Sequence, residues 1–246
     1  MVVLPDVTGY NRGHNAISRY RKMTTPASAS PVPVFKPDFK RRGVMLVMAS
    51  PPGAGKTTIS RELMRLDPQI MLSVSATTRE KRPGEIEGQH YFFVGQEEFQ
   101  SMVSRGEMLE YALVYNGHMY GTPRAPVEDA LAAGLDVMFD VDWQGNRRLC
   151  EGAKDDVVSI YLLPPSWDEL ERRLHSRARD SEEDIARRMS KAADEMSHYS
   201  EFQYVIVNHD FDDTLARVRA VLEAERLKRH RQTDIADFVS ALKPSA

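Results

Sequence analysis

The residues with the clearest chemical potential are a lysine and two threonines that follow a glycine-rich segment. Lys56, Thr57 and Thr58 come directly after residues 50–55, which read Ser-Pro-Pro-Gly-Ala-Gly. Backbone N–H groups in such a turn can surround an anionic phosphate, and the N-terminus of a following helix adds a favourable dipole. The ammonium group would reach the outer phosphates of a nucleotide, and the first threonine hydroxyl would bind Mg²⁺. This pattern predicts a phosphate-binding P-loop.

A strand and a helix are expected on either side of this segment. Residues 44–49 are all apolar and indicate a buried strand, whereas residues 59–66 have the spacing of an amphipathic helix. The full motif has a glycine six positions before the lysine, where this chain has Ser50. A strand-to-helix turn without a ligand is the alternative. The residues expected to bind the nucleotide phosphates are Ser50, Pro51, Pro52, Gly53, Ala54, Gly55, Lys56, Thr57 and Thr58.

Two carboxylates end a second apolar strand, which is expected over residues 135–142. Asp140 and Asp142 stand at its carboxyl end, and ligands bind beyond this end of the strands in open α/β sheets. Asp140 is therefore expected to hold Mg²⁺ together with Thr57, partly through the water shell of the ion. An acidic surface turn is the alternative.

Two groups of arginines suggest further contacts with anions. Arg79 and Arg82 follow a hydroxyl-rich stretch, and their planar guanidinium groups match phosphate oxygens. A charged surface loop is the alternative. Arg173 and Arg177 lie four positions apart on one expected helix, and Arg188 lies about three turns further on. Two antiparallel helices would bring these three side chains together, and a solvated helical hairpin is the alternative.

Further strands and helices alternate along the chain. Strands are expected over residues 108–114, 118–121, 157–163 and 204–208, and helices over residues 96–105, 126–133, 166–175, 181–199 and 213–230. Residues 233–246 are expected to add one turn or to fray. Asn116 and Gly117 are a strong hairpin signal between the first two of these strands. The alternation predicts an α/β fold with a parallel, doubly wound sheet and helices on both faces.

The composition is that of a chain with one sizeable core. Among 246 residues, positions 1–42 carry eight Lys and Arg against two Asp, a net charge of +6, and the remainder has a net charge of −9. Because nucleic-acid-binding proteins present a dominant basic face, the acidic body argues against a nucleic-acid partner. Cys150 is the single cysteine and fits a reducing compartment. The histidines lack zinc-ligand spacing, and no apolar run is long enough to suggest a membrane span.

Residues 1–42 are expected to be a mostly disordered extension, because they show no sustained apolar period and contain a stretch rich in Pro, Ser, Ala and Thr. Their basic character also fits an organelle transit peptide weakly. Translation starting at Met23 is a third interpretation. A cytoplasmic location is expected, with organelle import as the alternative.

Together, a set of motifs spread over residues 43–225 resembles the guanylate kinase family, in the order of that family. The motifs are Ser73-Val-Ser-Ala-Thr-Thr-Arg79, Arg82-Pro-Gly-Glu85, Tyr91, Tyr120-Gly-Thr-Pro123, Asp140-Val-Asp-Trp-Gln-Gly145, Pro164-Pro-Ser166, Arg173-Leu-His-Ser-Arg177, Asp180-Ser-Glu-Glu183 and Tyr204-Val-Ile-Val-Asn208. The resemblance implies a P-loop NTPase-type parallel sheet with helices on both faces, an inserted small mixed α+β lobe for GMP and a helical lid.

The resemblance also implies how the chain is divided. The core would comprise residues 43–75, 123–172 and 191–230, the GMP-binding lobe about 76–122 and the lid about 173–190. Residues 1–42 would remain a flexible basic extension, and residues 231–246 a C-terminal tail.

A guanine site is implied as well. Guanine presents two adjacent donors, N1–H and the 2-amino group, and Glu110 matches the carboxylate of the family that accepts both. Adenine has an acceptor at N1, and a site built on such pairing can reject the wrong base by roughly 10⁴-fold. The matched base-reading residues are Ser75, Glu110, Thr122 and Asp142. Those matched to the GMP phosphate are Arg79, Arg82, Tyr91 and Tyr120, and Glu85 matches a binding position in the same lobe.

The implied reaction transfers the γ-phosphoryl group of Mg-ATP to GMP, and to dGMP, to give ADP and GDP. Its substrates are the small molecules ATP and GMP, its cofactor is Mg²⁺, and a homo-oligomer is compatible with the sequence. Because the GMP phosphate oxygen is already anionic, catalysis reduces to positioning and neutralising charge. The catalytic residues implied are Lys56, Arg173, Arg177 and Arg188, and Asn208 is implied in ATP binding.

The chain departs from the family pattern at four places. Ser50 and Pro52 stand where glycine and a small residue are usual, and the missing N–H of the proline is expected to weaken the loop only modestly. Arg179 occupies a lid position that is more often threonine. The stretch between Glu110 and Tyr120 is one residue longer than usual, and a bulge in the hairpin around Asn116 and Gly117 is expected to absorb it.

Two other functions are open. Related scaffold domains bind peptides and lack a working P-loop, whereas Lys56, Thr57 and Asp140 are all present here. A kinase acting on another phosphorylated substrate, such as a ribose bisphosphate, would lack the guanine-reading residues, whereas Glu110 and Asp142 are retained.

Overall fold

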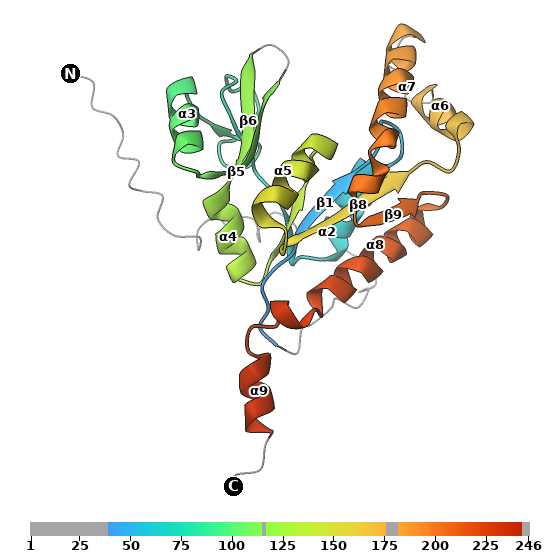
Figure 1. The fold of residues 1–246 in the computed structure, drawn as a ribbon. Helices are drawn as coiled ribbons and strands as arrows, with labels where there is room; N and C mark the ends of the chain where they lie inside the picture. Colours follow the sequence, from blue (N-terminus) through green and yellow to red (C-terminus); the bar gives the residue numbers. More distant parts are fainter. Residues whose placement is uncertain (1–38, 115–116, 176–181, 243–246) are drawn as a thin grey trace, which may run out of the picture.

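The fold is built on a five-stranded parallel sheet with the order β2-β7-β1-β8-β9 (Figure 1). The computed structural model describes residues 39–114, 117–175 and 182–242. The strands are β1 Met45–Ala49, β2 Ile70–Leu72, β7 Asp136–Phe139, β8 Val157–Leu163 and β9 Tyr204–Val207. This sheet confirms the predicted α/β fold, and the expected strands over 44–49, 157–163 and 204–208 are present nearly as predicted.

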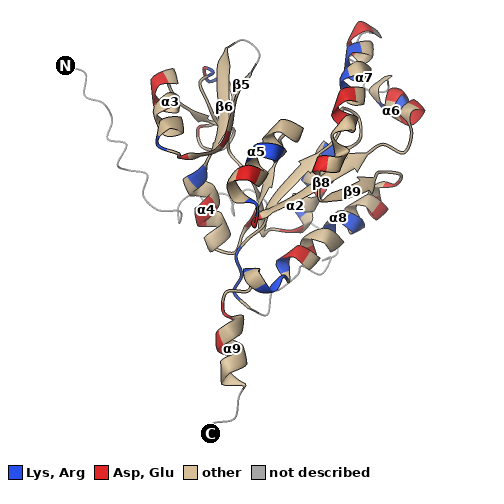
Figure 2. Cartoon of the chain, viewed as in Figure 1, with Lys and Arg blue, Asp and Glu red and all other residues tan. Residues whose placement is uncertain are grey.

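Helices cover both faces of the sheet, as the sequence predicts. Every residue of β1 is buried. A strand covered on both faces has no side open to water, which is why its sequence is a continuous apolar run. On one face the alternate β1 residues pack with α2 (Lys56–Leu66) and α8 (Phe211–Arg226). On the other face they pack with α4 (Arg124–Ala132) and α5 (Trp143–Ala153). Most charged residues lie in helices and loops, and β1 and β8 carry none (Figure 2).

A second, smaller sheet has the order β4-β3-β6-β5 and confirms the expected mixed α+β lobe. Its strands are β3 Ala76–Thr77, β4 Phe92–Phe93, β5 Met108–Val114 and β6 His118–Pro123, and α3 spans Gln96–Ser104. The β3–β4 pair is parallel and the other pairs are antiparallel. Phe99 of α3 is fully buried against Ala76 and Met108, and Met102 and Val103 of the same helix pack beside it.

The pairing of β5 with β6 has an even register from Glu110 opposite Thr122 to Val114 opposite His118. The register shift lies between Met108 and Glu110, at the other end of the hairpin from the bulge that the sequence suggested. Residues 115–116 lie outside the described part of the chain.

Two helices form a unit where a helical lid was expected. They are α6 Trp167–His175 and α7 Glu182–Ser197, and buried Leu170, Leu174, Ile185, Met189 and Ala192 pack between them. The Ser166 hydroxyl accepts a hydrogen bond from the Glu169 N–H (3.1 Å), as expected for the start of a capping-box helix. The 3₁₀ helix η2 (Tyr199–Glu201) follows α7, so the second helix ends two residues before the predicted position.

The helix α5 is absent from the elements predicted above. Its sequence contains two glycines and one asparagine within 11 residues, which are poor helix formers. Tertiary contacts compensate, because the Asp142 side chain accepts a hydrogen bond from the Gly145 N–H (3.0 Å) at the helix start. A β-carbon at Gly145 would lie 2.7 Å from Cβ of Val141, so only glycine allows this close approach.

Residues 39–42, which we expected to belong to the flexible extension, instead contact the core. The Arg41 side chain is buried and makes two hydrogen bonds to Asp136, at 2.6 and 3.1 Å. Arg42 makes two more to Asp156, at 2.8 and 2.6 Å. The charges that suggested a solvated segment are neutralised by these carboxylates. Residues 1–38 lie outside the described part of the chain.

The C-terminal end also differs from the prediction. In place of one helix over residues 213–230, α8 ends at Arg226 and is followed by the 3₁₀ helix η3 (Arg229–Arg231) and by α9 (Ile235–Ala241). Arg231 is buried and donates to the Gly43 carbonyl oxygen (2.9 Å). Part of the expected tail therefore belongs to the core. Of the helices in the described ranges, none is long and apolar enough to cross a membrane.

Candidate active site

The P-loop follows β1 and ends at the first turn of α2, as predicted. Gly53 and Gly55 have φ angles of 92° and 100°, in the left-handed region that favours glycine. A β-carbon at Gly55 would lie 2.5 Å from Nδ2 of Asn208. Lys56 is the first residue of α2. The two glycines thus allow the backbone to curl tightly at the positive end of the helix dipole.

Asn208 supports the P-loop from behind. Its Nδ2 group donates to the Ala54 carbonyl oxygen (2.7 Å), and its Oδ1 atom accepts from the Thr214 hydroxyl (3.0 Å). The side chain is buried and does not line the pocket described next. Asn208 thus contacts the loop that is expected to hold ATP, and its own contact with ATP stays a prediction.

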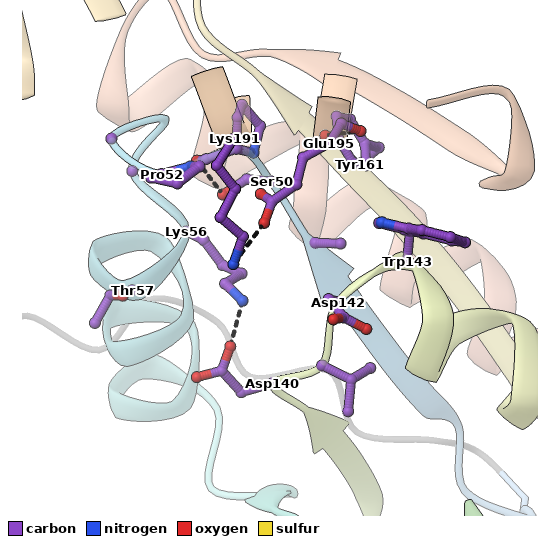
Figure 3. Close-up of a pocket in the computed structure, with 15 residues that line it drawn as sticks. Ser50, Pro52, Lys56, Thr57, Asp140, Asp142, Trp143, Tyr161, Lys191 and Glu195 are labelled. Carbon is purple, nitrogen blue, oxygen red and sulfur yellow. Dashed lines mark hydrogen bonds and ion pairs between the residues drawn. The ribbon is translucent and has the colours of Figure 1, made fainter. Parts of the chain in front are cut away.

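The P-loop borders a pocket of about 300 Å³ (Figure 3). The residues expected to bind phosphate that line it are Ser50, Pro51, Pro52, Gly53, Gly55, Lys56 and Thr57, together with Asp140 and Asp142. Ala54 and Thr58 do not line it. Trp143, Tyr161, Lys191 and Glu195 also line it, and the sequence interpretation gave none of them a role in binding. Trp143 is partly buried against the core and also stacks on His198 with ring centroids 3.6 Å apart.

Lys56 and Asp140 form an ion pair within this pocket. The Asp140 carboxylate is 68% exposed, and Thr57 lines the same pocket. Carboxylate, hydroxyl and water oxygens are the ligands that Mg²⁺ prefers. These two side chains therefore fit the magnesium role that the sequence suggests.

The guanine-reading residues predicted from the family are partly assembled. The Thr122 hydroxyl donates to the Glu110 carboxylate (2.8 Å), and both side chains are buried. Burial raises the pKa of Glu110, and the negative charge of Asp142 acts in the same direction, while Arg148 and the bond from Thr122 oppose the shift. Ser75 is half-buried at the start of β3. Glu110 is thus a desolvated acceptor within electrostatic range of Asp142.

The residues expected to bind the GMP phosphate lie on the same small lobe. The Arg79 guanidinium bonds to both oxygens of Glu85, at 2.7 and 3.1 Å, and lies 5.3 Å from the ring centre of Tyr91. The Tyr91 and Tyr120 ring centres are 5.9 Å apart. The Arg82 backbone N–H donates to Glu85 (2.7 Å). Glu85 therefore holds the loop that carries Arg79 and Arg82.

The donor and acceptor residues do not share one cavity. Among the residues expected to bind GMP, Asp142 alone lines the P-loop pocket in the described part of the chain. The helical arginines are also separate from it. Arg173 bonds to Glu169 (2.7 Å) and to the Asn208 carbonyl oxygen (3.4 Å), and Arg188 is half-buried on α7. Arg177 lies outside the described residues, so the expected convergence of three arginines stays a prediction.

A parallel sheet, a P-loop at the carboxyl end of β1 and an aspartate at the end of the neighbouring β7 define the P-loop class of phosphate-binding α/β proteins. The guanylate kinase family model matches residues 42–225. The chain therefore belongs to the guanylate kinase family.

Individual relatives agree with this assignment. A guanylate kinase of Paramagnetospirillum magneticum is 55% identical over 207 residues, which cover 84% of this chain and 96% of that protein. A guanylate kinase of Rhodospirillum rubrum is 52% identical over 221 residues, covering 90% and 98%. The crystal structure of guanylate kinase from Anaplasma phagocytophilum superimposes with a TM-score of 0.63 at 38% identity, covering 85% of this chain and 99% of that one.

Proposed function

We propose that this chain transfers the γ-phosphoryl group of ATP to GMP, and to dGMP, giving ADP and GDP. The observation that carries the proposal is the combination of a P-loop pocket with a buried Glu110–Thr122 pair next to it. The pocket can hold a triphosphate, and the buried carboxylate can accept two adjacent N–H groups of a base. The single cysteine fits the reducing cytoplasm, where we place the reaction.

The donor half of the site binds ATP through the P-loop backbone and Lys56. The Lys56 ammonium group forms an ion pair with Asp140. When ATP binds, its more highly charged phosphates would replace the Asp140 carboxylate as the partner of Lys56. The freed carboxylate, with the Thr57 hydroxyl, would then hold Mg²⁺. Mg²⁺ held by these two side chains would supply positive charge that offsets the negative charge of the transferred group. Arg173, Arg177 and Arg188 would add positive charge on the side of the two-helix unit.

The acceptor half binds GMP through the small lobe. Glu110 accepts hydrogen bonds from N1–H and the 2-amino group of guanine, and Ser75, Thr122 and Asp142 contact other edges of the base. Arg79 and Arg82, with Tyr91 and Tyr120, hold its phosphate. Because the reacting phosphate oxygen is already anionic, the chain needs no strong general base. Approach of the lobe and the two helices would align the two phosphates and exclude water.

A coupled assay of ADP release tests the proposed function. GMP, dGMP, AMP, UMP and CMP are compared as acceptors, and turnover is expected with GMP and dGMP only. Lys56→Ala serves as the negative control, because loss of a charge at the transferring phosphoryl group is expected to lower kcat at least about 100-fold. Equal turnover of AMP or UMP would contradict the assignment of guanine specificity, and normal kcat in Lys56→Ala would contradict the P-loop assignment.

A further inference from the structure

We propose that Lys191 is a further phosphate-binding residue of this site, and that Glu195 positions it beside the P-loop until a nucleotide binds. The inference rests on the proposed phosphoryl transfer and adds a residue to it. Lys191 and Glu195 line the P-loop pocket with Lys56 and Asp140 (Figure 3).

The backbone of α7 is fixed at the place where these side chains enter the pocket. The Tyr161 hydroxyl of β8 donates to the backbone carbonyl oxygen of Glu195 (2.8 Å). Ala192 is fully buried against α6 in the next turn. These contacts hold this part of the helix against the sheet and leave its remaining face to the pocket.

That face carries polar residues at helical spacing. Arg188, Lys191 and Glu195 follow one another at intervals of three and four residues and so share one stripe of α7. The apolar residues Ile185, Met189 and Ala192 pack against α6. The stripe therefore continues from an arginine with a proposed catalytic role to a lysine in the P-loop pocket.

The pocket contains two ammonium groups, and each has a carboxylate partner. The Lys191 ammonium lies 3.2 Å from Glu195 Oε1, with side chains 66% and 13% exposed, and Lys56 pairs with Asp140. Burial raises the pKa of Glu195, Lys191 lowers it, and the charges of Lys56 and Asp142 also act on this carboxyl. Glu195 thus offsets the repulsion between two cations that border one pocket.

When the donor nucleotide binds, its phosphate oxygens would replace Glu195 as the partner of Lys191 and Asp140 as the partner of Lys56. Charge-assisted hydrogen bonds favour this exchange, because a triphosphate carries more negative charge than a carboxylate. Lys191 has a long and exposed side chain, so it can leave Glu195 without any change in the backbone. It then shares the charge of the donor phosphate chain with Lys56.

The test replaces Lys191 by glutamine and measures binding of ATP and of inorganic tripolyphosphate, which has no base. Lys191→Gln is expected to weaken both by about tenfold and to leave GMP affinity unchanged, whereas Lys191→Arg restores most of the binding. The matched control is Arg187→Gln on the same helix, because Arg187 is 76% exposed and pairs with Asp184. Unchanged affinity for both polyphosphates in Lys191→Gln would overturn the proposal.

A second variant tests the role of Glu195. Glu195→Gln keeps the backbone carbonyl that Tyr161 contacts and removes the competing charge, so it is expected to tighten tripolyphosphate binding several-fold. When Glu195→Gln is combined with Lys191→Gln, the gain in tripolyphosphate affinity is expected to disappear. The same gain with and without Lys191 would show that Glu195 does not act through Lys191. A wild-type protein that binds polyphosphate but does not phosphorylate GMP would refute the proposed function alone.

Discussion

At the scale of single residues, Glu110 is a carboxylate held largely away from water. It is buried and accepts a hydrogen bond from one partner, the Thr122 hydroxyl, in the described structure. A buried carboxylate accepts further hydrogen bonds readily, because its charge is incompletely solvated. Two adjacent N–H donors of guanine would satisfy it, whereas the acceptor at N1 of adenine would repel it.

This environment predicts an acid limb in the pH profile. Since burial raises the pKa of Glu110, protonation occurs at a higher pH than for an ordinary glutamate. Protonation removes the charged acceptor, so kcat/KM for GMP is expected to fall as the pH decreases through that raised pKa, while the affinity for ATP stays constant. Steady-state kinetics between about pH 4.5 and 8, a range that lies above the usual glutamate pKa of about 4.3, measure this fall.

Glu110→Gln is the control for this profile. It is expected to lower kcat/KM for GMP by about 100-fold, since one charged hydrogen bond and the pairing of two donors are disturbed. The acid limb is expected to disappear with it. A limb that persists in Glu110→Gln would assign the titration to another group.

At the scale of elements, the junction of β1 with α2 depends on backbone conformation. Gly55 combines a left-handed φ angle with close approach of the Asn208 side chain. Asn208 in turn holds the Ala54 carbonyl oxygen. The shape of the phosphate loop therefore depends on a contact between the end of β9 and the start of α2.

Gly55→Ala is expected to weaken ATP binding more than tenfold, because the added carbon displaces Asn208 and strains the backbone. Gly106→Ala provides the matched control, since Gly106 also has a positive φ angle of 70° but has no atom near the added carbon. It is expected to lower the free energy of unfolding by about 1 kcal/mol and to leave ATP binding unchanged. Calorimetric titration with ATP and urea denaturation measure the two effects, and equal losses of ATP affinity would contradict the role of Asn208.

Most strands and helices could be predicted from the sequence, because the patterns that mark them span only a few neighbouring residues. Apolar runs such as β8 and the Asn116-Gly117 hairpin signal lie within a few residues, and the P-loop glycines mark their own turn. The helix α5 was missed, since its glycines fit only because of a neighbour, Val141. Lys191 was missed for a related reason. One lysine on a charged helix gives no signal until the fold brings it to the P-loop.

At the scale of the whole molecule, a buried network of ion pairs joins distant parts of the chain. Asp136 at the start of β7 is fully buried and pairs with Arg41 before β1 and with Arg226 at the end of α8. Arg226 also pairs with Asp67, at 2.7 Å. The network links the segment before the first strand, the sheet and the last long helix.

Asp136→Asn tests this network because it removes one charge and preserves the shape of the side chain. Two buried guanidinium groups would lose their shared anion, so the free energy of unfolding is expected to fall by about 3 kcal/mol or more. Asp213→Asn, which breaks an exposed pair with Arg217, is expected to cost less than about 1 kcal/mol. Urea denaturation gives both values, and similar small losses would show that the network adds no stability.

The role of residues 39–42 could not be predicted from their sequence. A short basic segment after a stretch rich in proline and serine is typical of solvated chain. In the structure, Arg41 and Arg42 bond to carboxylates that lie 95 and 114 positions further along the chain. Ion pairs between residues so far apart leave no pattern in the nearby sequence. The sequence therefore could not show that residues 39–42 belong to the core.

The same network has a consequence for how the protein is made. Asp136 and Arg41 are synthesised well before Arg226, which lies 90 positions after Asp136. Until Arg226 leaves the ribosome, the sheet holds a buried anion with only one of its two guanidinium partners, and α2 and β8 are not yet fully covered by α8. The growing chain therefore completes this core only after residue 226 has been synthesised, and a nascent chain halted before that residue remains open to proteases that the folded domain resists.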